Sequence, residues 1–237
     1  ELDAARIREL LAVFGMPQDI YAASTGSLAR HLDADLAARL RQPPDADTLT
    51  AIDGALAWLR EPSHRLLTLA DPDYPPSLLA LHDPPPMLYL NGRVELLRRP
   101  AIAVVGARSA TAGGMDNARA FAHYLAQRGW CVVSGLASGI DAAAHEGALD
   151  AGPDAGGTIA VLGTGIDVVY PARNRALAHR TAAQGLLASE FPLGTRALPF
   201  FFPKRNRIVA ALSRGVLVVE AARQSGSLIT ARLASEL

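Results

Sequence analysis

The chain has 237 residues, half of them apolar, which is enough for one large core with a small satellite domain and excludes a disordered protein. Its 23 basic and 23 acidic residues balance, and no uncharged apolar run approaches the roughly 18 residues that cross a membrane. No basic and apolar leader opens the chain, and its single cysteine, Cys131, cannot form an internal disulfide, so a cytoplasmic protein is expected.

The first 62 residues (1–62) are expected to form a small all-helical domain. Apolar residues recur at helical spacing from Leu2 to Phe14, and Gly15 and Pro17 end this helix. Further helices are expected over residues 18–24, 26–31, 33–40 and 47–60. The pattern resembles a sterile-alpha-motif (SAM) or helix-hairpin-helix bundle, and some such bundles bind DNA. Residues 1–100 carry ten basic and fourteen acidic groups, so a protein-contact or packing role is an equally open alternative.

Residues 63–237 are predicted to form an α/β domain. Short strands at 66–69 and 87–90, separated by a stiff proline-rich segment, are expected to pack on the edge of a sheet. Beyond residue 100, apolar strands alternate with helices. Strands are expected at 101–105, 131–133, 158–162, 186–188 and 215–219, with helices at 114–128, 139–150, 173–184, 204–212 and from about 227. Such alternation is typical of a doubly wound, Rossmann-like parallel sheet.

Small and polar residues cluster after each predicted parallel strand. The clusters lie at 106–109, 134–141, 163–167, 189–190 and 220–227. Parallel strands end at one edge of their sheet, and doubly wound sheets bind ligands outside the carboxyl ends of their strands. The sequence therefore predicts one binding site, built from these turns along that edge.

A basic and aromatic segment points to the ligand at this edge. Phe202 precedes three cations, Lys204, Arg205 and Arg207, where a loop kept irregular by Pro203 is expected to enter a helix. A helix N-terminus favours anions because its first backbone N–H groups are unpaired. The segment therefore predicts a phosphate site, with a solvated basic turn as the alternative.

The two arginines of this segment are expected to differ in role. Arg205 and Arg207 are two positions apart, so they cannot face the same way on a helix. We expect Arg205 to contact nucleic acid. Arg207, nearer the apolar end of the segment, is expected to pair inside the protein with Glu190 or Glu220.

Two other turns fit anions. Arg108 follows a buried strand on a glycine-led turn, where its guanidinium can bind phosphate; an ion pair with Glu190 or Asp167 is the alternative. The segment Ser225-Gly226-Ser227 puts two hydroxyls at a helix start, as an anion cradle or as a simple cap.

Residues that would indicate catalysis are scarce. Ser138 and Asp141 predict a capping box. Asp141 and His145 could be read with a nearby serine as a hydrolytic triad, but a surface or cap pair is the simpler interpretation. No nucleophile elbow, phosphate-binding Walker loop, complete dinucleotide fingerprint or metal-ligand spacing is present. We therefore expect no cofactor, no metal and no enzymatic activity, and a groove that binds single-stranded nucleic acid through cations and stacking rings.

Six motifs, in order and spacing, resemble the DNA-processing protein A (DprA/Smf) family over about residues 65–237. They are Gly106-x-Arg108-Ser109, residues 134–141, residues 160–167 with Tyr170-Pro171 and Asn174, Ser189-Glu190-x-Pro192, residues 202–207, and Glu220-Ala221 with the Ser225–Ser227 turn. The resemblance implies a Rossmann-like core that binds single-stranded DNA. It further implies a homodimer that protects incoming strands and loads the RecA recombinase during natural transformation and DNA recombination in competent cells.

The same motifs define the expected DNA-binding residues. These are Arg108, Ser109, Gly135, Ser138, Gly139, Arg173, Asn174, Phe202, Lys204, Arg205, Asn206, Arg207, Ser225, Gly226 and Ser227. Ala107 stands where the family usually has serine. The family's core continues with a further strand and often a winged-helix domain, so the C-terminal end is expected to be truncated.

A rival interpretation is a nucleotide-phosphate N-glycoside hydrolase of a related Rossmann type, which would share the phosphate-binding turns. It would need a catalytic acid, for which Glu190 and Glu220 are the candidates. A pure protein scaffold is the third alternative.

Overall fold

The computed structural model describes residues 2–222 and 225–236. The chain divides into two compact units, Glu1–Ala57 and Trp58–Leu237, and the division falls at the end of helix α5 (Ala46–Trp58). No helix of the described ranges is long and apolar enough to cross a membrane.

The N-terminal unit is helical. It contains α1 (Ala4–Phe14), α2 (Pro17–Ala22), α3 (Thr25–Leu28), α4 (Ala34–Leu40) and most of α5. The side chains of Asp3, Ser24 and Asp33 accept hydrogen bonds from free N–H groups at the starts of α1, α3 and α4. Leu10 and Leu28 are fully buried in a small core, whereas α5 buries no residue.

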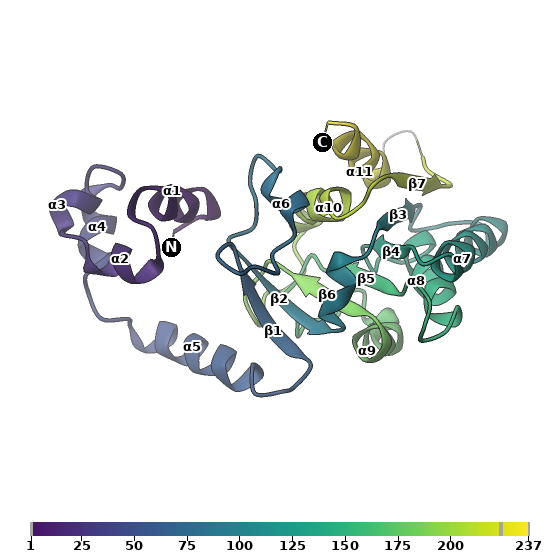
Figure 1. Cartoon of the computed structure of the whole chain (residues 1–237), viewed down its shortest axis with the longest axis horizontal. Coiled ribbons are helices and arrows are strands. Elements are labelled where there is room, and N and C mark those ends of the chain that lie inside the picture. Colours follow the sequence, from purple (N-terminus) through teal and green to yellow (C-terminus); the bar gives the residue numbers. More distant parts are fainter. Residues whose placement is uncertain (1, 223–224, 237) are drawn as a thin grey trace. The chain divides into compact units, whose positions relative to one another are not determined.

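The second unit is built on a seven-stranded, mostly parallel sheet (Figure 1). Its strands are β1 (His64–Thr68), β2 (Met87–Gly92), β3 (Ala101–Gly106), β4 (Cys131–Ser134), β5 (Thr158–Val161), β6 (Leu186–Ser189) and β7 (Val216–Val219). They lie in the order β1-β2-β6-β5-β4-β3-β7. β1 and β2 pair antiparallel with one another, and β2 pairs antiparallel with β6. The expected α/β sheet, with the two early strands added at its edge, is therefore confirmed.

Helices cover both faces of this sheet (Figure 1). α7 (Ala112–Gln127), α8 (Ile140–Asp150) and α9 (Arg175–Gln184) pack on one face, while α6 (Pro76–Leu79), α10 (Phe201–Ala211) and α11 (Gly226–Ser235) pack on the other. Short 3-10 helices span Val94–Arg98 and Ala172–Asn174. Successive strand residues alternate between the two cores: Val132 packs under α7 and α8, whereas Val133 packs on the α10 side. Both faces of the sheet are covered by helices, which explains why the strands are continuous apolar runs.

Two helices that border the site, α10 and α8, begin differently from expectation. α10 begins at Phe201 rather than at residue 204, so Pro203 lies inside its first turn. Proline fits there because the first turn leaves its N–H groups unpaired in any case. α8 begins at Ile140, with Gly139 as a cap residue that makes no side-chain bond, so the capping box expected from Ser138 is wrong.

Candidate nucleic-acid interface

The carboxyl-end edge of the sheet opens into a cavity of about 510 Å³. The turn after β3, the loop after β4 and the first turns of α10 and α11 form its walls. Its lining contains seven of the residues expected to bind DNA: Arg108, Phe202, Arg205, Asn206, Ser225, Gly226 and Ser227. Three helix N-termini, those of α8, α10 and α11, meet at this lining, and the positive ends of their helix dipoles make it favourable for an anion.

The loop after β4 is held from beneath by side chains. Asp141 Oδ2 accepts hydrogen bonds from the backbone N–H of Gly135 at 3.1 Å and of Ala137 at 3.4 Å. Asn174 Nδ2 donates to the carbonyl oxygens of Leu136 at 2.9 Å and Ala137 at 3.2 Å. Asn174, expected to contact DNA, therefore positions this loop instead of lining the cavity.

The outer end of the same loop is fastened in a different way. Arg173 Nε donates to Ser138 Oγ at 2.8 Å, so both of these expected DNA contacts already bond each other. Gly139 has a φ of 73°, and a Cβ there would overlap the carbonyl oxygen of Ala107. Glycine thus allows the loops after β3 and β4 to pack directly on one another.

His145 lies fully buried below this loop and does not pair with Asp141. Thr158 Oγ1 donates to the Val132 carbonyl at 2.6 Å, so the His145 Nδ1–H donates to Thr158 Oγ1 at 2.8 Å. His145 Nε2 then accepts from the Leu136 N–H at 3.3 Å, which fixes a neutral ring. Burial lowers the pKa of His145 to about 3. The triad is not formed, and the expected surface or cap pair is also wrong.

Arg205 forms the floor of the cavity. It is only 4% exposed, and its Nη1 donates to the carbonyl of Val161. Burial lowers its pKa to about 10, against the opposing attraction of Asp141. Burial likewise raises the pKa of the Asp141 carboxyl, while Arg205 and the two loop N–H groups lower it. The Nε of Arg205 has no hydrogen-bond partner among the residues that the structure describes. Arg205 is therefore a buried part of the cavity, not an exposed arm.

Arg108 is the exposed cation of the cavity. Its guanidinium carbon lies 5.2 Å from the centroid of the Phe202 ring, and it has no carboxylate partner within the described ranges. The alternative ion pair with Glu190 or Asp167 is not formed. Tyr170, which sequence reasoning did not assign to the site, packs 5.4 Å from Phe202 and remains 48% exposed. The sequence signal that could have identified Tyr170 is its place just after the 163–167 turn, at the predicted binding edge of the sheet.

The start of α11 supplies hydroxyls to the opposite wall. Ser225 Oγ and Ser227 Oγ lie 2.6 Å apart and share a hydrogen bond. Asn206 Nδ2 donates to the Gly226 carbonyl at 3.2 Å, which joins α10 to the first turn of α11. This turn is thus fixed against α10 and presents its N-terminus to the cavity.

Arg207 lies outside the described lining of the cavity. Its expected pairing with Glu190 is confirmed, whereas the DNA contact that the family resemblance implied for it finds no support in this position. Its Nη2 donates to Glu190 Oε2, and its Nε lies 3.0 Å from Asp83 Oδ2, an ion pair without hydrogen-bond geometry. The Arg207 and Glu190 side chains are 8% and 4% exposed. Burial raises the pKa of the Glu190 carboxyl, although Arg207 and Lys204 lower it. Lys204 Nζ lies 3.8 Å from Glu190 on this side of α10.

The two candidate acids of a hydrolase lie outside the cavity lining. Glu190 is held by Arg207, and Glu220 accepts from the Thr111 N–H at 2.9 Å and from its hydroxyl at 2.6 Å. These bonds lower the pKa of Glu220. Both carboxylates therefore have structural partners, and the geometry gives neither a position facing a ligand in the cavity.

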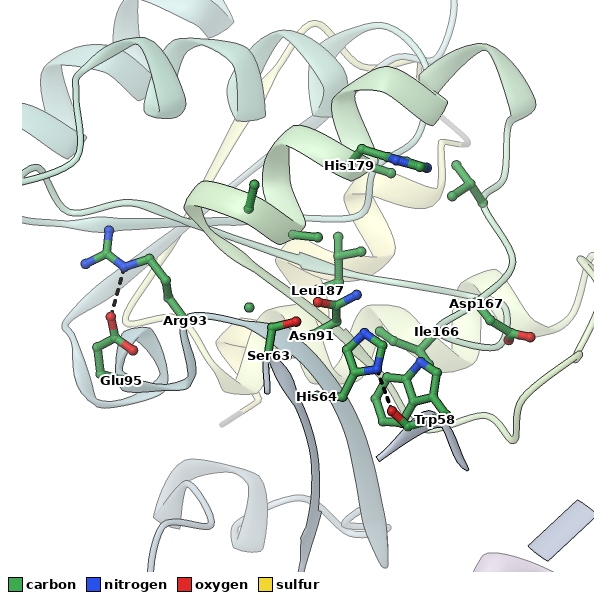
Figure 2. Close-up of a pocket in the computed structure, with 15 residues that line it drawn as sticks. Trp58, Ser63, His64, Asn91, Arg93, Glu95, Ile166, Asp167, His179 and Leu187 are labelled. Carbon is green, nitrogen blue, oxygen red and sulfur yellow. Dashed lines mark hydrogen bonds and ion pairs between the residues drawn. The ribbon is translucent and has the colours of Figure 1, made fainter. Parts of the chain in front are cut away.

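A second cavity, of about 770 Å³, lies between β2 and α9 (Figure 2). Trp58 stacks on His64 with ring centroids 4.0 Å apart, and the His64 Nδ1 bonds the Trp58 carbonyl at 2.8 Å. Arg93 bonds Glu95 at 2.8 Å, and Asp167 adds another carboxylate. Among the described residues that line this cavity, the arginine is Arg93, which is paired with Glu95, so the electrostatics of this cavity suit phosphate less well.

Comparisons with known proteins point to one family for this chain. Residues 65–237 match the family model for DNA recombination-mediator protein A. The chain is 46% identical over 187 residues to Protein Smf of Escherichia coli (strain K12), which covers 78% of this chain and 49% of that protein. It is 44% identical over 169 residues to DNA processing protein DprA of Streptococcus pneumoniae, covering 71% and 58% respectively. The chain thus spans about half the length of these curated relatives.

Solved structures show the same fold. The X-ray structure of DprA from Streptococcus pneumoniae aligns with a TM-score of 0.83 and 35% identity over 99% of this chain and 79% of that one. DprA from Helicobacter pylori, described for its single-stranded DNA binding mode, aligns with a TM-score of 0.65 and 34% identity, covering 73% and 77%. The motifs, the sheet and these relatives agree, and the chain belongs to the DNA recombination-mediator protein A family.

Proposed function

We propose that this chain binds single-stranded DNA in the cavity at the carboxyl-end edge of its sheet, as a binding protein and not as an enzyme. The observation that carries the proposal is the pairing of Arg108 with Phe202 at 5.2 Å. The exposed guanidinium is free to meet a phosphate, and the neighbouring ring can stack on a base. The N-termini of α10 and α11 add partial positive charge at the same place.

The geometry favours single strands over duplexes. Phe202 and Tyr170 can stack only on bases that are exposed, and the bases of a duplex are covered by their neighbours. The described lining of the cavity comes from loops and helix starts, and not from an exposed helix face of the kind that enters the major groove. The single-stranded DNA binding mode described for the Helicobacter pylori relative supports the same ligand.

Family membership supports a biological role. We propose that the protein acts in the cytoplasm, in DNA recombination during natural transformation, as a homodimer that protects incoming strands and loads RecA onto them. Faster assembly of RecA on a strand already coated by a single-strand-binding protein is the expected result in a loading assay. An unchanged assembly rate would contradict the loading role.

The DNA-binding proposal has a direct test. Fluorescence anisotropy compares a labelled single strand with a blunt duplex of the same sequence at matched salt. We expect tighter binding of the single strand and little dependence on its sequence. Equal or tighter binding of the duplex would contradict the proposal.

A further inference from the structure

A second aromatic surface lies outside the cavity, at the start of α10. Phe200 is 64% exposed, and its ring packs edge-on against Phe201 with centroids 4.5 Å apart. Phe201 in turn lies 4.3 Å from Phe191, which is buried. We call Phe191, Phe201 and Phe200 the phenylalanine ladder. None of the three belongs to the described lining of the cavity, although Phe202 does.

Helix geometry places this ladder on the opposite side of α10 from the cavity. Phe200 and Phe202 are two positions apart, so they leave the helix roughly 200° apart. Phe202 faces the cavity and Arg108. Lys204, four positions after Phe200, shares its side of the helix. Its Nζ lies 5.7 Å from the centroid of Phe191, next to the ladder.

The phenylalanine ladder has an exposed ring, that of Phe200, packed on a fixed ring and close to the cation of Lys204. Phe201 packs against the Phe200 ring, and Phe191 packs against Phe201. The Phe200 ring is therefore already held in place, and stacking a ligand on it costs little conformational entropy. The carboxylate near Lys204 belongs to Glu190, which already bonds the guanidinium of Arg207. Lys204 forms only a long ion pair with this carboxylate, at 3.8 Å, and its side chain is 42% exposed, so its ammonium group can also approach a phosphate. A ring beside a cation is the pattern with which proteins hold successive nucleotides of a single strand.

We propose that the phenylalanine ladder is a second base-stacking site. A base of the bound strand stacks on Phe200 where the strand crosses the start of α10, and Lys204 lies beside the adjoining phosphate. The inference rests on the proposed function, because it takes the cavity as the first contact of the same strand. It assigns Phe200 a role that is independent of Arg108 and Phe202.

The test uses the whole chain and an oligothymidylate long enough to span both sites, with Kd measured by anisotropy. Base stacking on a protein ring corresponds to a loss of about 5- to 150-fold in affinity on substitution by alanine, and this is the effect expected for Phe200→Ala. Phe200→Trp should keep the affinity, whereas Phe200→Leu, apolar but not aromatic, should lose it. Phe121→Ala is the matched control, since Phe121 is a 50% exposed phenylalanine on α7, outside both sites.

An abasic oligomer of the same length separates stacking from other effects. Wild type and Phe200→Ala should bind it equally, because it offers phosphates and no bases. The proposal would be wrong if Phe200→Ala bound oligothymidylate as tightly as wild type does. It would also be wrong if Phe200→Ala lost as much affinity for the abasic strand as for oligothymidylate. In that case wild type would still prefer single strands and Arg108→Ala would still bind them weakly. Failure of wild type itself to bind single strands would overturn the proposed function and the ladder together.

Discussion

Arg205 and Gly135 are packed so closely that a side chain at position 135 has no room. A Cβ on Gly135 would overlap Nη1, Nη2 and Cζ of Arg205. Moving the guanidinium aside would break its hydrogen bond to the Val161 carbonyl and weaken its attraction to Asp141 in a buried place. This contact therefore couples the floor of the cavity to the loop after β4.

Gly135→Ala tests that coupling. The added methyl group should lower the free energy of unfolding by about 1–3 kcal/mol, the usual cost of overpacking, and should weaken DNA binding by displacing Arg205. In an Arg205→Met background, which keeps the stem and removes the guanidinium, the same methyl group has more room and should cost less. Urea unfolding of the four proteins measures the coupling in a double-mutant cycle, and strictly additive effects would contradict it.

Arg207 is expected to matter for stability and not for DNA contact. Arg207→Ala leaves the buried Glu190 carboxylate without its main partner, a change that typically costs about 3–5 kcal/mol. Thermal unfolding should show the loss, while the folded fraction keeps its affinity for single strands. The double variant with Glu190→Gln, which removes the stranded charge, should recover part of the stability. An unchanged melting temperature in Arg207→Ala would refute this assignment.

The sheet and the edge at which the candidate site lies could be predicted from the sequence because their signals are local. Apolar runs such as 101–105 mark buried strands, and the turns that follow them must share one edge. The pairing of Arg207 with Glu190 could also be predicted, since two arginines two positions apart on a helix must diverge. The start of α10 was misplaced because proline breaks a helix interior but fits its first turn.

The roles of the buried polar residues could not be predicted in the same way. Asn174 and Asp141 both bond the backbone of the loop after β4, and His145 bonds Thr158. Each partner is supplied by tertiary packing, which local spacing does not encode. Nor did the sequence indicate that Arg205 would be buried, because its burial depends on a glycine seventy positions earlier, at Gly135.

Arg108 is the residue whose loss should weaken binding without unfolding the protein. Its guanidinium is exposed, so Arg108→Ala should leave the melting temperature unchanged and weaken single-strand binding by ~1–3 kcal/mol, the range for a charge-assisted contact. Arg180→Ala serves as the control and should bind as wild type, since Arg180 lies on α9, is 39% exposed and pairs with Asp150. Normal affinity in Arg108→Ala, with folding verified, would contradict the cavity as the DNA site.

Salt dependence gives an independent count of the phosphates that are neutralised. If the strand meets about four to six phosphates on the protein, log K should fall against log salt with a slope of roughly −3 to −4. Arg108→Ala removes one such contact and should make the slope shallower by about 0.7. A wild-type slope near zero would mean that the cations of this edge do not meet the strand.

The buried imidazole of His145 should make stability depend on pH. Its pKa of about 3 in the folded protein lies below the ordinary 6.5, so between these values the unfolded chain binds a proton that the folded protein does not. The contribution of His145 to the free energy of unfolding is therefore fully present above pH 6.5. It falls as the pH is lowered, by about 2 kcal/mol between pH 7 and pH 5. Asp141 acts in the opposite sense, because its folded pKa is raised and the folded protein takes up its proton more readily. His145→Gln keeps Asp141 and removes the titrating ring, so the difference between the two proteins isolates the histidine. Urea unfolding at pH 5, 6 and 7 should show wild type losing stability more steeply than His145→Gln, and parallel losses would mean that His145 is protonated in the folded state.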